Sequence, residues 1–148
     1  MTPSAVTTDS LTAALDGLVD RVPGAEVAVV LSPDGLLLGR SRNLPDRLAE
    51  QLSSLVSGLY VLGQATARVC ATGALRQVIV QMSRAFVFIA TTRGGAILTV
   101  RMGDDADVGD MAYEVALFAA QAERALPVYL EPAGTGTGGD SGAHHWRP

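Results

Sequence analysis

Lysine is absent from this chain of 148 residues, whose eleven basic residues are all arginine. Chemistry that depends on lysine is therefore excluded, including Schiff bases, lysine general bases and the phosphate-binding lysine of Walker motifs. The formal net charge is −4 and no basic tract is present, so the electrostatic attraction that dominates nucleic-acid binding is missing. We expect no nucleic-acid partner.

Cysteine and long hydrophobic runs are also scarce. The single cysteine, Cys70, cannot form an internal disulfide, which is typical of a reducing cytosol. No apolar run approaches the roughly 20 residues that span a bilayer. The N-terminal sequence MTPSAVTTDS lacks the basic and hydrophobic regions of a secretory signal. We expect a cytoplasmic protein that does not insert into a membrane and is peripheral to it only through partners.

The spacing of apolar residues, with glycine and proline between the segments, predicts eight elements. Asp9 or Ser10 is expected to cap the first helix, Asn43 the second and Asp107 the third. The predicted elements are a helix over 11–22, strands over 26–31 and 36–40, a helix over 45–69, strands over 75–82, 85–91 and 96–102, and a helix that ends near 126.

Composition divides the chain into three parts. Residues 10–127 are expected to form one domain, since a chain of this length can bury one hydrophobic core. Residues 1–9 are expected to be flexible, and the glycine-rich residues 128–148 to be a disordered tail. In that tail, the run Gly134–Gly139 has no lysine and so resembles a phosphate loop only in composition. The two adjacent histidines lack the further ligands that a metal site needs.

The strand predicted at 85–91 is apolar on both sides. Phe86 and Phe88 lie on one face, and Val87 and Ile89 on the other. The short connections on either side of this strand predict an antiparallel meander with its two neighbours. Because an antiparallel sheet with two apolar faces needs a cover on each, we expect helices on both sides.

The long helix carries leucines at intervals of 4, 3, 4 and 3 residues, the repeat of a helix that packs against another helix. We call this set the leucine seam. Its members are Leu48, Leu52, Leu55, Leu59 and Leu62. Left exposed in a monomer, such a patch is a liability, and a two-fold interface removes it by burying the same patch on both copies.

The order of elements, helix, two strands, long helix, three strands, helix, resembles that of the Roadblock/LC7 family over residues 10–127. The stretches that carry the resemblance are LVDRVPGAEVAVVLSPDGLLLGRS (18–41), RQVIVQM (76–82), FVFIATTRGGAILTV (86–100) and DADVGDMAYEVALF (105–118). Within the family, the chain resembles the small stand-alone actinobacterial members encoded beside a sensor kinase and a small Ras-like GTPase. The resemblance implies an α+β fold, a three-layer α/β/α sandwich around a five-stranded antiparallel sheet.

The resemblance also implies a homodimer, in which the long helix packs beside its symmetry mate and the third strand extends the sheet into the second copy. Pairing along that strand would protect an otherwise open sheet edge. The expected dimer interface consists of Leu48, Leu52, Leu55, Val56, Leu59, Leu62, Arg76, Val78 and Val80.

Three arginines, Arg40, Arg42 and Arg47, gather where the second strand meets the long helix; we call them the arginine rim. One hypothesis is that the rim binds the GTPase and offers an arginine finger, worth about 10³–10⁵ in rate. The alternative is a solvated surface paired with Asp34 or Asp46. The resemblance favours stimulation, where it occurs, through the GTPase's own switch elements.

No catalytic constellation and no cofactor site can be assembled from the sequence. The acidic run Asp104–Asp110 fails as an EF-hand, since its glycine and glutamate positions do not match, and Asp107 is expected to cap a helix instead. Cys70 is expected to be a buried core residue, and Tyr113 an amphipathic packing residue.

The leading hypothesis is therefore a non-enzymatic, homodimeric module that binds and modulates a small Ras-like GTPase, as an activator or as a scaffold, and through it a sensor histidine kinase. The alternative is a pure assembly scaffold that clusters kinases or other Roadblock proteins without engaging a GTPase. A small-ligand sensor ranks last because the strands offer few inward polar residues.

Overall fold

The computed structural model describes residues 3–92 and 94–122. The helices and strands follow one another in the predicted order: α1 (Pro3–Arg21), β1 (Ala25–Leu31), β2 (Leu37–Arg40), α2 (Asp46–Cys70), β3 (Gln77–Gln81), β4 (Ala85–Thr91), β5 (Ile97–Gly103) and α3 (Val108–Ala122). None of the described helices is long and apolar enough to cross a membrane. The predicted tail, 128–148, lies outside the described residues.

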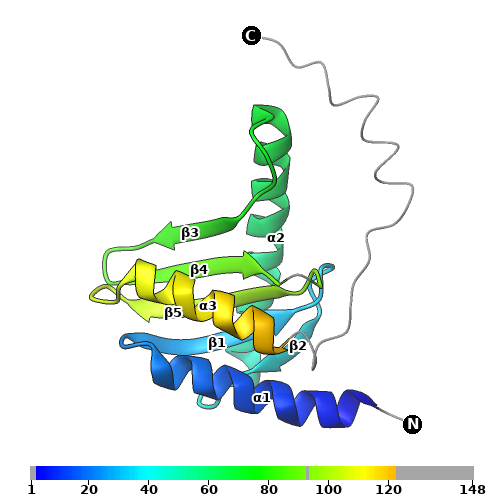
Figure 1. Ribbon diagram of the computed structural model, residues 1–148, viewed down its shortest axis with the longest axis vertical. Coiled ribbons are helices and arrows are strands. Elements are labelled where there is room, and N and C mark those ends of the chain that lie inside the picture. The colour runs from blue at the N-terminus through cyan, green and yellow to red at the C-terminus, as the bar shows by residue number, and fades with distance from the viewer. Residues whose placement is uncertain (1–2, 93, 123–148) are drawn as a thin grey trace.

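The five strands form one antiparallel sheet in the order β2-β1-β5-β4-β3 (Figure 1). The predicted meander is confirmed, since β3, β4 and β5 are consecutive neighbours. In register, Val29 of β1 and Ile89 of β4 both pair with Thr99 of β5, which puts Thr99 in the middle of the sheet. The strand order leaves β2 and β3 as the two edges of the sheet.

Helices cover both faces of the sheet, as the two-sided strand β4 predicts (Figure 1). Phe88 lies in the larger core, which α1 and α3 form with one face. Val87 and Ile89 lie in the core beneath α2 on the opposite face, and Val56 of α2 is fully buried there. The alternation of side chains along β4 thus separates two cores.

The β1–β2 turn is the hairpin turn that its residues predict. The backbone N–H of Gly35 donates to the carbonyl of Ser32 at 2.9 Å, and Gly35 has φ +94°, which glycine adopts without strain. The Ser32 hydroxyl donates to Asp34 and accepts the N–H of Leu36 at 2.9 Å. The polar groups of the turn are thus hydrogen-bonded within the turn itself, and its role is to connect β1 to β2.

The caps predicted for the first two helices were wrong. Helix α1 begins at Pro3, so Asp9 and Ser10 lie inside the helix; proline is compatible with a first helical turn, and no other proline interrupts the segment. At α2, Pro45 is the N-cap and no side chain caps it, while Asn43 adopts a left-handed conformation with φ +68°. Asparagine tolerates that conformation, which turns the chain into the helix.

Candidate functional site

The leucine seam divides into buried and exposed members along α2. Leu52 and Leu59 are half-buried and pack against the core beneath the sheet. Leu48, Leu55 and Leu62, spaced by seven, are 48%, 67% and 66% exposed. An exposed leucine at each second helical turn is the pattern of a helix that meets another helix.

Val56, expected in the dimer interface, is instead fully buried against its own sheet. It lies between the leucines in sequence, but its position on the helix points at the core. We therefore leave Val56 out of the exposed surface. The heptad spacing continues at Val69, which is 53% exposed.

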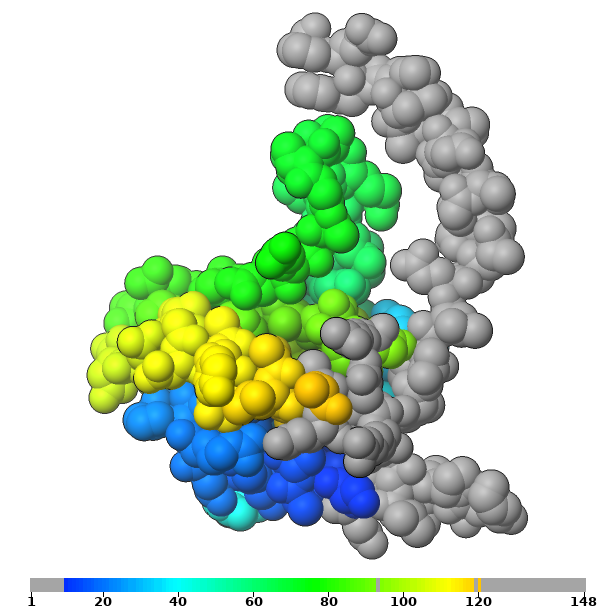
Figure 2. All heavy atoms as spheres, in the orientation of Figure 1, coloured from blue at the N-terminus to red at the C-terminus, as the bar shows by residue number. Residues whose placement is uncertain are grey.

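The end of α2 projects beyond strand β3, away from the rest of the protein (Figures 1 and 2). At Gly63 the helix still lies close to the chain that enters β3, since a Cβ there would lie 2.9 Å from a methyl carbon of Leu75 and 3.1 Å from one of Val78. Arg68 and Val69, near the end of the helix, are exposed. Cys70 is also exposed, and the prediction of a buried core cysteine was wrong.

Strand β3 is an edge of the sheet, with alternating exposure. Val78 and Val80 are half-buried and pack on the α2 side, whereas Ile79 is 40% exposed on the other side. Arg76, just before the strand, is exposed. Val78 and Val80 share the core beneath α2 with Leu52 and Leu59, so this edge lies beside the leucine seam.

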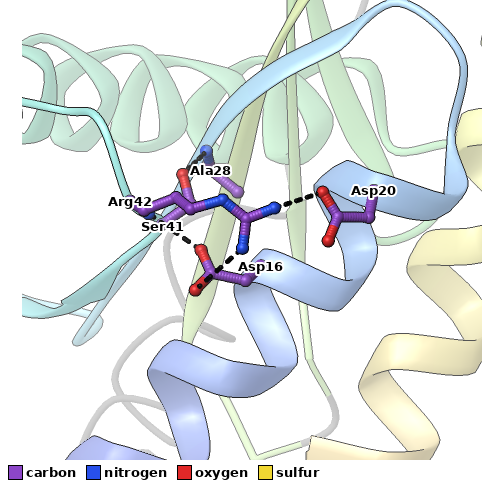
Figure 3. Close-up of polar contacts among 5 residues, drawn as sticks. All are labelled: Asp16, Asp20, Ala28, Ser41 and Arg42. Atoms are coloured by element: carbon purple, nitrogen blue, oxygen red, sulfur yellow. Dashed lines mark hydrogen bonds and ion pairs between the residues drawn. The ribbon is translucent and has the colours of Figure 1, made fainter.

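Two members of the arginine rim are bound to acidic residues of their own chain. Arg40 forms an ion pair with Asp46, as one alternative expected. Arg42 is held by helix α1: its backbone N–H donates to Asp16 Oδ1 at 2.8 Å, its Nη1 lies 3.5 Å from Asp16 Oδ2, and its Nη2 donates to Asp20 Oδ1 at 2.5 Å (Figure 3).

The Arg42 side chain thus attaches the β2–α2 connection to α1. The hydrogen bond to Asp20, with the negative charges of Asp20 and Asp16, raises the pKa of Arg42 above its ordinary value. The neighbouring Ser41 attaches the same connection to β1: its N–H donates to the carbonyl of Ala28 at 2.8 Å, and its hydroxyl accepts the N–H of Ala28 at 2.9 Å.

Arg47 differs from its neighbours in the rim. It is exposed in the first turn of α2 and forms no ion pair with an acidic residue in the described part of the chain. A guanidinium that no described residue of its chain engages is open, on that observation, to a partner's carboxylate or phosphate.

The described residues offer little for catalysis or metal binding. Across residues 3–92 and 94–122, no three His, Cys, Asp or Glu side chains gather as a metal site.

In the acidic run, the Asp107 carboxylate accepts hydrogen bonds from the backbone N–H groups of Gly109 at 2.7 Å and Asp110 at 3.2 Å, which confirms its role as a helix cap. A shallow hollow of about 410 Å³ is lined by β2, Thr12, Ser41 and Arg42, so Arg40 and Arg42 of the rim form part of its wall.

Comparison with known proteins agrees with this architecture. The family profile described as Roadblock/LC7 domain matches residues 11–102. A Roadblock/LC7 domain from Streptomyces avermitilis is 34% identical, with 76% of this chain and 94% of that one covered and a TM-score of 0.72. A second such structure from that organism is 33% identical, covers 75% and 96%, and has a TM-score of 0.63.

More distant structures share the fold. The gliding protein MglB from Thermus thermophilus is 16% identical, with 80% of this chain and 90% of that one covered and a TM-score of 0.69. At that identity the likeness extends to the fold alone. No protein with a curated description matches the chain.

Proposed function

Because the chain belongs to the Roadblock/LC7 family, we propose that it is a non-enzymatic, homodimeric regulatory module that docks a small Ras-like GTPase. The observation that carries the proposal is the exposed part of the leucine seam. Leu48, Leu55 and Leu62 lie on a helix whose end extends past the sheet. An exposed apolar row of this kind marks an interaction surface.

A second copy of the chain fits this surface on physical grounds. Two seams that pack around a two-fold axis bury the same leucines on both copies. The open edge of β3 lies beside the seam, and antiparallel pairing with the β3 of a second copy would satisfy its unpaired backbone groups. Arg76, Val78 and Val80 belong to this part of the proposed interface.

In the dimer, Leu48 is the first residue of the seam, and Arg47 beside it in the first turn of α2 would face a partner at the margin of the interface. Arg40 and Arg42 are engaged by Asp46, Asp16 and Asp20, so we assign them to the support of this surface. The GTPase as partner rests on the family resemblance. A role in a sensor-kinase system would follow from tethering that GTPase near the kinase.

The experiment mixes the purified chain with the small Ras-like GTPases encoded in its own genome, loaded with GDP or with a non-hydrolysable GTP analogue. Calorimetry and light scattering are expected to detect a complex in at least one nucleotide state. Absence of a complex in both states contradicts the proposal. Kinase that co-purifies with the chain after deletion of the GTPase would favour the alternative, a pure assembly scaffold.

Substitutions of the rim separate binding from support. Arg47→Ala is expected to weaken the complex without changing the unfolding transition, whereas Arg42→Ala is expected to loosen the β2–α2 connection first. If Arg42→Ala leaves binding and stability unchanged but abolishes stimulated GTP hydrolysis, Arg42 acts as an arginine finger, and the assignment of a supporting role is wrong.

A further inference from the structure

The surface outside the leucine seam is uneven in charge. Residues 51–103 contain no acidic residue, although the whole chain has 15. This segment runs from the second turn of α2 through β3 and β4 to the end of β5, and all its charged residues are arginines. In a chain whose net charge is −4, positive charge is therefore concentrated in this part of the protein.

Arg68 belongs to this segment, and it is exposed in the last turn of α2. Three heptads separate it from Arg47, so both arginines lie on one row of the helix, with Ser54 and Val61 between them. We call these four residues the outer row. Neither arginine forms an ion pair with an acidic residue among residues 3–92 and 94–122.

The outer row lies on a different side of α2 from the leucine seam. Val61 follows Leu55 by six residues, and at about 100° per residue the two side chains are about 120° apart around the helix. Val61 is 53% exposed. A second α2 that packs on the seam therefore leaves the outer row open to solvent.

The β1–β2 turn contacts α2 beside the outer row. A Cβ on Gly35 would lie 2.8 Å from the hydroxyl oxygen of Ser57, one helical turn before Val61. Leu36, the next residue of the turn, is 65% exposed. Leu36 and Val61 thus form an apolar centre, and Arg68 lies two helical turns beyond it. Exposed apolar residues next to an arginine are typical of a binding surface.

We propose that the outer row, together with Leu36, is the surface on which the small GTPase binds, and that the GTPase presents carboxylates to it. This inference rests on the proposed function and adds the chemistry of the partner. Arg47 has Glu50 three residues away, whereas no carboxylate follows Glu50 in α2, so the Arg68 end carries the larger unbalanced charge. A guanidinium binds a carboxylate by two parallel hydrogen bonds.

The length of the outer row favours a folded domain over a short peptide. Arg47 and Arg68 are about 31 Å apart along the helix axis. A folded domain of about 150 residues has a radius of gyration of about 15 Å, so it can reach both ends of the row. An extended peptide would need about nine residues held straight. Carboxylates on the domain would also steer the encounter toward this positive surface.

Binding of the GTPase to variants of the full chain tests the proposal. Arg68→Gln, and separately Leu36→Ser with Val61→Ser, should each weaken the complex by about 5- to 50-fold in calorimetry. Arg68→Gln should also make the affinity less sensitive to salt, because one charged contact is lost. Each variant should remain a dimer with an unchanged unfolding transition, since the replaced side chains are exposed.

Two control variants match these changes. Arg84→Gln removes the same charge from an exposed position in the β3–β4 turn. Tyr113→Ser removes an apolar side chain from α3, where Tyr113 is 65% exposed against the expectation that it packs. Both controls should bind the GTPase as the unmodified chain does. Equal weakening by Arg84→Gln and Arg68→Gln would overturn the proposal, because the effect would then come from net charge alone.

The remaining outcomes separate this inference from the function on which it rests. A complex that is unaffected by the Leu36 and Val61 pair overturns the outer row as the binding surface and leaves the proposed function standing. Conversion of that pair to a monomer also overturns it, since the row would then contact a second copy. If no GTPase binds the unmodified chain, the proposed function is wrong and this inference is wrong with it.

Discussion

Replacing Thr99 by valine is expected to stabilise the protein. Thr99 lies in the centre of the sheet, is 0% exposed, and has no hydrogen-bond partner for its hydroxyl in the described part of the chain. Burial of an unpaired hydroxyl costs about 1–3 kcal/mol in proteins. Valine keeps the branched shape and the preference for strands, so its methyl group can replace the hydroxyl at little steric cost.

Taking the lower end of that range, we expect Thr99→Val to raise the free energy of unfolding by about 1 kcal/mol, which for a domain of this size raises Tm by about 3–4 °C. Urea unfolding followed by circular dichroism measures it, with an unchanged m-value showing that the folded and unfolded states are comparable. Chain concentration is held fixed because dimerisation would contribute to the measured stability.

Thr92 supplies the matched control. It is 5% exposed, and its hydroxyl accepts the N–H of Ala96 at 3.2 Å. Thr92→Val leaves that buried N–H with one bond fewer and is expected to lower the free energy of unfolding by about 1 kcal/mol. Opposite signs for the two substitutions support the reasoning. A loss of stability in Thr99→Val of the same size as in Thr92→Val would refute it.

Further substitutions test packing and the rim. Gly39→Ala would place a Cβ 2.7 Å from a methyl carbon of buried Leu11, so we expect a loss of about 1–3 kcal/mol in urea unfolding. Gly58→Ala on α2 meets no atom within 4 Å and should stabilise the chain by about 0.5–1 kcal/mol; a loss would indicate an unrecognised contact. Arg42→Ala should accelerate hydrogen exchange in the β2–α2 connection, and Arg47→Ala should not; equal exchange would contradict the assigned attachment to α1.

Much of the fold could be predicted from the sequence because its signals are local. The turn from Ser32 to Gly35 contains the residues that a hairpin turn needs, and its bonds are made within the turn. The alternation from Phe86 to Ile89 predicts two covered faces, and the two cores confirm it. Asp107 lies just before the helix that it was expected to cap.

The features that the sequence did not predict depend on contacts that are distant in sequence or on weak local preferences. Arg42 is bound by Asp16 and Asp20, more than twenty residues earlier, so no local pattern could show that it is engaged. Cys70 is exposed because α2 extends past the edge of the sheet. The spacing of apolar residues predicts a helix but does not show where the sheet beneath it ends. Val56 fits the apolar pattern of α2 whether it faces a second copy or its own sheet, so the pattern alone could not show that it is buried in the core.

The most direct test of the account is the mass of the chain in solution when the seam is charged. Sedimentation equilibrium is expected to give twice the chain mass for the unmodified protein. Leu55→Asp with Leu62→Asp should give the single-chain mass with unchanged circular dichroism, because burying the new carboxylates without partners is costly. Leu36→Asp, at a residue 65% exposed in the β1–β2 turn, is the control and should remain dimeric. A dimer that persists in the Leu55 and Leu62 variant would contradict the central claim.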